Sequence, residues 1–180
     1  MQAWQWSMVL GFLLIARGFF CLSAPGPAAK MARSFARATW TGRLIAAAAW
    51  IWAGWALYVM PLEFLLPFRH WIPVLILLAI PLSWYWMADL LSCRALGGLL
   101  VLFPCPMLIA VRANPSAWRL ALVIFAYISI MLGMTLILYP YYLRRWLDWL
   151  AARQTRMQIW GGTSLAIGGL FLLISHTALR

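Results

Sequence analysis

The chain has 180 residues, of which 66% are apolar and only 9% are charged. A soluble domain normally carries about a quarter charged residues, so this composition excludes an ordinary soluble fold. The charge is strongly positive, with 14 Lys and Arg against 3 Asp and Glu. Because the bases cluster beside apolar runs, we expect them to face anionic lipid headgroups and not nucleic acid.

Apolar runs long enough to cross a membrane recur along the whole chain. We therefore predict an all-α integral membrane protein in which residues 1–180 form a single polytopic domain. A signal peptide requires a basic residue before its apolar run. No base precedes the first run of this chain, so we interpret the run as a membrane span. The predicted spans are Trp4–Leu22, Leu44–Met60, Trp71–Trp86, Ala95–Val111, Trp118–Tyr139 and Ile159–Leu179.

Basic residues are distributed unevenly between the connections of these spans. The first, third and fifth connections hold most of them, and the other two hold few. The positive-inside rule then places those three connections in the cytoplasm and both chain termini outside it. We expect a multi-pass protein of a bacterial inner, or plasma, membrane.

The first and fifth connections resemble each other. Each begins near a proline, Pro25 or Pro140, continues as a basic stretch, and ends in Ala-Arg-x-Thr before the next span. The pattern predicts a parallel internal repeat. The repeated units are residues about 8–60 and 123–177, with a helical insert at 61–122. This helix–Pro–basic–helix unit resembles short bacterial membrane proteins of unknown function, a likeness that implies no activity.

The two basic stretches are predicted to be amphipathic helices that lie in the membrane interface. Their aromatic and aliphatic side chains would face the lipid and their bases the anionic headgroups, or an acidic partner. Alternatively, they are ordinary loops whose bases only set the topology. The residues proposed to bind lipid or a partner are Lys30, Arg33, Arg37, Arg43, Arg144, Arg145, Arg153 and Arg156.

Small residues recur at helical spacing in two of the spans. Close backbone contact drives helix association in lipid, so such stripes predict helix seams. They are expected within this bundle, although they could instead contact another subunit. The stripes are Ala46, Ala49, Ala53 and Ala56 in one span, and Gly162, Ala166 and Gly169 in the other.

Pro104, Cys105 and Pro106 interrupt the fourth span. Each proline removes a backbone donor and crowds the carbonyl four residues back. Unsatisfied backbone is costly in hydrocarbon, so we predict a broken helix that other protein shields at this depth. A broken span also occurs at transporter binding sites, but few polar groups accompany this one.

Groups that could carry chemistry are few. The three acids are Glu63, Asp89 and Asp148, and Asp148 is expected to pair with Arg144 or Arg145. His70 and His176 are at span ends, where they could ligate a haem or a chlorin, although a solvated histidine is ordinary there. The cysteines have no metal-binding or redox spacing and are expected to be buried, reduced thiols. We expect no metal, no cofactor and no catalytic residue.

The leading functional hypothesis is a non-enzymatic accessory or scaffold subunit that packs within a larger membrane complex. The first alternative is a small transporter or channel subunit built around the broken fourth span. The second is a pigment-, haem- or quinone-associated subunit of an electron-transfer complex, with His70 or His176 as the ligand.

Overall fold

The computed structural model describes residues 2–59, 69–86, 91–112 and 116–177, and within these ranges its regular structure is helical with no strand. Five segments are long and apolar enough to cross a membrane, which makes the chain a multi-pass integral membrane protein by helix length and hydropathy. They are α1 (Ala3–Ser23), α3 (Thr39–Val59), α5 with α6 (Leu91–Leu102 and Pro104–Arg112), α7 (Arg119–Leu138) and α9 (Gln154–Thr177).

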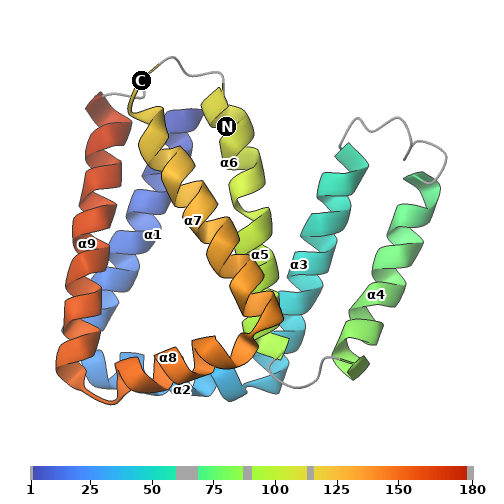
Figure 1. Ribbon diagram of the computed structural model, residues 1–180, viewed down its shortest axis with the longest axis horizontal. Helices are drawn as coiled ribbons and strands as arrows, with labels where there is room; N and C mark the ends of the chain where they lie inside the picture. The colour runs from blue at the N-terminus through green and yellow to red at the C-terminus, as the bar shows by residue number, and fades with distance from the viewer. Residues whose placement is uncertain (1, 60–68, 87–90, 113–115, 178–180) are drawn as a thin grey trace.

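The remaining helices differ in length and direction. The helix α4 (Ile72–Trp86) has 15 residues and lies beside α3 at one side of the molecule (Figure 1). The helices α2 (Pro25–Arg37) and α8 (Pro140–Ala151) lie across one end of the bundle, side by side and roughly perpendicular to the long helices. The start of α1 and the end of α9 lie at the opposite end of the bundle from α2 and α8 (Figure 1).

The seam between α1 and α9 is the most extensive helix contact in the described residues. Two glycines of each helix meet across it. A methyl group added at Gly18 would lie 2.7 Å from the carbonyl oxygen of Gly161, and one added at Gly168 would lie 2.9 Å from that of Gly11. The two pairs have the same seven-residue spacing, so the backbones touch at two points two turns apart.

The helix α5 lies between α3 and α7. Gly97 of α5 and Gly133 of α7 meet backbone to backbone, because a methyl group on either would lie within 2.8 Å of the other's carbonyl oxygen. On the α3 side, Gly42 leaves room for Ser92, whose hydroxyl donates to the Ala38 carbonyl at 2.7 Å. Small residues on both faces of α5 therefore bring three helices together.

The predicted break in the fourth span is present. The helix α5 ends at Leu102 and α6 begins at Pro104, with Phe103 between them. The Phe103 N–H still donates to the Leu99 carbonyl at 2.8 Å, so the two helices continue as one bent span. Pro104 has no N–H to donate to Leu100, which is the physical reason for ending α5 here.

Five of the six predicted spans correspond to the candidate membrane spans, whereas the third, Trp71–Trp86, corresponds to the 15-residue α4, which is not among them. Three of the spans begin at least four residues earlier than predicted, and α5 begins at Leu91, four residues before the predicted Ala95.

The helices α3 and α9 begin at Thr39 and Gln154, five residues before the predicted spans Leu44–Met60 and Ile159–Leu179. Most of the extra residues of α3 and α9 are polar or basic, with Trp40 and Met157 as the large apolar exceptions, and they continue the helix to the level of α2 and α8. The Thr of each Ala-Arg-x-Thr segment, Thr39 or Thr155, thus belongs to the following helix.

Candidate functional site

The strongest candidate site is the layer formed by α2 and α8, called here the basal layer. Each of the two helices has a proline at its first position, where the missing N–H is not needed and the fixed φ favours helix. Each also separates polar from apolar side chains around its axis, whereas the long spans are apolar on all sides. Strong amphipathicity with low overall hydrophobicity is typical of helices that lie in a membrane interface.

The basal layer is held to the bundle by apolar contacts. Ala28 of α2, Leu150 of α8, Cys21 of α1 and Met157 of α9 form one buried cluster. One charged group bridges the two helices, since Arg33 Nη2 donates to the carbonyl oxygen of Ala151 at 2.8 Å. This bond also satisfies a carbonyl at the C-terminal end of α8, which no residue of its own helix can reach.

Most of the predicted lipid-binding bases are exposed on or beside the basal layer. Lys30, Arg144, Arg145 and Arg153 are exposed, and Arg33 is exposed apart from its bond to Ala151. The side chain of Arg37 lies outside the described residues. The same end of the bundle therefore carries a group of cations on two parallel strips, the arrangement that a negatively charged surface attracts.

Arg43 and Arg156 lie beside the basal layer, in the first turns of α3 and α9. The Arg156 guanidinium lies 4.2 Å from the ring centre of Trp149 and donates to the Trp149 carbonyl at 3.0 Å. The Arg43 guanidinium lies 5.8 Å from the rings of both Trp40 and Trp84. Arg43 is nevertheless exposed and Arg156 is half-exposed, so the ring contacts orient these two guanidinium groups without burying them.

Arg17 of α1 is a site residue that the sequence patterns did not select. Its Nη2 donates to the hydroxyl of Ser164 on α9, and its guanidinium lies 5.2 Å from the ring centre of Trp160. Trp160 in turn packs edge-on against Trp146 of α8, with ring centres 4.9 Å apart. A charge on a membrane helix normally marks a functional position, and that signal was available in the sequence.

Two buried donors near the basal layer have no hydrogen-bond partner, the Nε1 of Trp84 on α4 and the Nε of Arg94 on α5. Trp84 packs against the cluster of Ala46, Leu91 and Ala95. The acid nearest to Arg94 in sequence, Asp89, lies outside the described residues, as does Glu63. Asp148 makes no ion pair within 4 Å in the described part of the chain, so its expected pairing with Arg144 or Arg145 is not seen.

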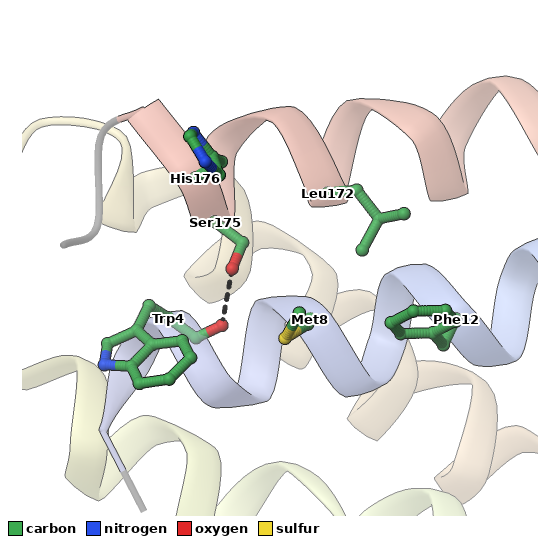
Figure 2. A pocket seen from close by; sticks show the side chains of 6 residues that line it. All are labelled: Trp4, Met8, Phe12, Leu172, Ser175 and His176. Carbon is green, nitrogen blue, oxygen red and sulfur yellow. Dashed lines mark hydrogen bonds between the residues drawn. The ribbon is translucent and has the colours of Figure 1, made fainter.

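The two histidines do not form a common site in one chain. His70 is exposed just before α4, and His176 is exposed near the end of α9, while α4 and α9 lie at opposite sides of the molecule. His176 borders a shallow hollow of about 220 Å³ between α1 and α9. Figure 2 shows that Trp4, Met8, Phe12 and Leu172 line it, and that the Ser175 hydroxyl donates to the Trp4 carbonyl at 2.8 Å.

This hollow is largely apolar, because its one buried hydroxyl is already bonded. No group of three or more His, Cys, Asp or Glu side chains that could hold a metal occurs in the described ranges. A cofactor role for His70 or His176 stays a prediction that nothing here tests.

The two small-residue stripes differ in what they face: part of the α3 stripe packs against α5 as expected, whereas the α9 stripe makes no seam with α1. In α3, Ala46 is buried against α5, and Ala49 lies 3.9 Å from where a methyl group on Gly98 would be, while Ala53 and Ala56 are half-buried. In α9 the expected stripe faces away from α1. A methyl group at Gly162 or Gly169 would have nothing within 4 Å, and Ala166 is exposed. The seam within this chain uses Gly161 and Gly168 instead.

The proline break is shielded on one side only. Pro104, Met107 and Val111 are buried at the centre of the bundle, and Pro106 is half-buried. Cys105, in contrast, is exposed, with its thiol 3.8 Å from the Val101 carbonyl. The expectation that all three cysteines are buried is therefore wrong for Cys105, because residues 104 and 105 point about 100° apart around a helix. Cys21 and Cys93 are buried as expected.

In comparisons with known protein families, with curated proteins and with solved structures, nothing matched this chain.

Proposed function

We propose that the protein is a non-enzymatic membrane subunit that holds a larger complex against an anionic membrane surface. One observation carries this proposal: two amphipathic helices, α2 and α8, pack side by side at one end of the bundle and expose Lys30, Arg144 and Arg145 there. A single basic loop would only determine the orientation of the chain in the membrane. A layer of two helices tied by the Arg33 bond presents a fixed basic surface.

The proposed placement in the membrane follows from the same layer. The bundle crosses the membrane with about six spans, α4 being the third and the bent α5–α6 segment the fourth. The basal layer lies in the cytoplasmic headgroup region, and both chain ends lie on the other side. The units α1–α2–α3 and α7–α8–α9 each run long helix, basal helix, long helix, which supports the proposed internal repeat.

Packing within a complex is the second element of the proposal. Large apolar side chains are exposed on every long helix, as lipid contact requires, but the open glycines Gly162 and Gly169 offer something more specific. They allow another helix to approach the backbone of α9 closely. Transport is less well supported, because the buried side of the proline break is filled by Met107 and Val111.

Lipid analysis around the protein tests the basal layer. Protein extracted with its surrounding lipid in polymer-bounded discs should be enriched in anionic lipid. The triple variant Lys30→Gln, Arg144→Gln, Arg145→Gln should lose most of that enrichment, because each base near an anionic surface contributes about 1 kcal/mol. The matched control is the triple variant Arg69→Gln, Arg112→Gln, Arg119→Gln, which removes the same number of exposed charges from the opposite end of the bundle.

Equal enrichment in the triple basal variant and the control would refute the proposed role of the basal layer. The complex is tested separately by the mass of the wild-type protein on a native gel after mild solubilisation. Migration as a lone chain in every mild detergent tried would refute the subunit proposal while leaving the lipid proposal standing.

A further inference from the structure

Among the bases of the described residues, Arg17 lies well inside a long helix and contacts a second long helix, α9. It is six residues before the end of α1, about 9 Å along the helix axis. The contact with Ser164 reaches across the seam to α9, where Ser164 is itself buried and donates to the Trp160 carbonyl at 2.8 Å. The guanidinium is therefore held at a defined place between Ser164 and the ring of Trp160.

The contacts of Arg17 leave most of its donors available. A guanidinium has five N–H groups in a planar fork, and the structure gives it one hydrogen bond and one ring face. The hydroxyl and the ring are neutral, so neither balances the charge. The whole chain has three acids, Glu63, Asp89 and Asp148, and none lies on α1 or α9.

The surface around Arg17 is apolar and open. Leu13 and Phe20, which share its side of α1 at helical spacing, are 57% and 42% exposed, and Ile167 of α9 is 48% exposed. Large apolar side chains that flank a charge at this depth are suited to acyl chains, whereas a soluble acidic partner would gain nothing from them. The indoles of Trp146 and Trp160 mark the level of the headgroups beside it.

We propose that Arg17, Ser164 and Trp160 form a binding site for the phosphate of one anionic phospholipid. The planar fork binds two phosphate oxygens, Ser164 and Trp160 hold the fork in position, and the acyl chains lie along Leu13, Phe20 and Ile167. This inference deepens the proposed lipid-binding function, because it adds one specific, tightly held lipid to the general attraction of the basal layer.

Native mass spectrometry in detergent tests the site, because detergent removes loosely held lipid. We expect wild-type protein to retain one phosphatidylglycerol per chain after exchange into a neutral detergent containing that lipid. Arg17→Gln should weaken retention at least about tenfold, since a charge-assisted hydrogen bond contributes that much or more. Arg17→Lys should fall between the two, because an ammonium keeps the charge but not the planar fork. The control Arg112→Gln should bind as the wild type does.

A second measurement keeps the test valid if Arg17→Gln folds poorly. Added phosphatidylglycerol should raise the melting temperature of the wild type and of Arg112→Gln, while Arg17→Gln should show little response at any starting stability. Equal lipid retention in Arg17→Gln and Arg112→Gln would overturn the proposal, as would a wild type that retains no phospholipid. If the triple basal variant loses the general enrichment in anionic lipid but still holds this single lipid, the Arg17 site is independent of the basal layer.

Discussion

The contact between α1 and α9 and the contact between α3 and α4 both contain glycine. The glycines of the first contact face backbone, and the glycine of the second faces a side chain. Gly18 faces the backbone carbonyl of Gly161, so any side chain there must push two helices apart. Gly54 of α3 faces Cγ1 and Cδ1 of the Ile76 side chain of α4, and a side chain can change its rotamer where a backbone carbonyl cannot move. Ile72 is the one residue of α4 that is buried. The first contact is a rigid seam and the second is a side-chain contact that can be repacked.

Alanine at the glycines of the rigid seam should have the largest effect. Gly18→Ala should lower the free energy of unfolding by about 1–3 kcal/mol through overpacking, even though alanine favours helix by up to about 1 kcal/mol. Gly11→Ala with Gly18→Ala should cost roughly twice as much. Gly54→Ala should stay within about 1 kcal/mol of the wild type. Unfolding in mixed micelles measures all three, and equal losses for Gly18→Ala and Gly54→Ala would erase the distinction.

Hydrogen bonds across the same seam should give a smaller effect. Ser7 is buried and donates to the Phe171 carbonyl at 2.7 Å, and Ser175 donates to that of Trp4. Ser7→Ala should cost about 0.5–1.5 kcal/mol, and Ser175→Ala a similar amount. The matched control is Ser83→Ala in α4, whose hydroxyl donates only within its own helix, to Ile80. A control as destabilising as Ser7→Ala would argue against a special role for the seam.

The open glycines of α9 should respond in the opposite direction. In the isolated chain, Gly162→Ala and Gly169→Ala meet nothing within 4 Å, so each should leave stability unchanged or raise it by up to about 1 kcal/mol. In the proposed complex, Gly162→Leu should reduce co-purification of the partner without affecting the isolated chain. Unchanged co-purification would move the partner contact to another face of the bundle.

Thiol labelling should leave stability unchanged and report accessibility alone. Cys105 is exposed on the outside of the bundle, while Cys21 and Cys93 are buried. A membrane-permeant maleimide should therefore modify one thiol per folded chain, and Cys105→Ser should abolish the labelling. A charged, impermeant maleimide should react slowly in membranes, because Cys105 faces lipid in the proposed placement. Fast reaction with the impermeant reagent would indicate a wet path at the proline break.

Much of the fold could be predicted from residue patterns of short range. Apolar length predicted the five candidate spans, together with a sixth that corresponds to the shorter α4. The alternation of bases and apolar residues predicted the two helices of the basal layer. The proline break followed from a missing donor, which is a property of one residue. The three early helix starts at Thr39, Leu91 and Gln154 were missed, because polar residues can continue a helix beyond the apolar core.

The details that depend on partners far apart in sequence could not be obtained the same way. Gly161 and Gly162 are adjacent, as are Gly168 and Gly169, so composition does not say which pair faces a neighbour. The seven-residue spacing of Gly11 and Gly18 matches both pairs, so it points to α9 as a partner but not to the face of α9 that makes the contact. The contact of Arg17 could not be predicted because its partner Ser164 is 147 residues away in sequence. A serine in an apolar run is not recognisable as a hydrogen-bond partner until it is known which helices pack together.

The basal layer also affects the shape that the protein occupies in a membrane. Two helices of 13 and 12 residues lying flat, each roughly 10 Å wide and 20 Å long, cover on the order of 400 Å². In the proposed placement that area is added to one leaflet and not to the other, which makes the chain a wedge. Many such wedges side by side expand the leaflet that holds the basal layer, and the bilayer then curves so that this leaflet is on the convex side. Copies of the protein should accordingly gather where that leaflet is convex, since interfacial helices bind such surfaces more readily.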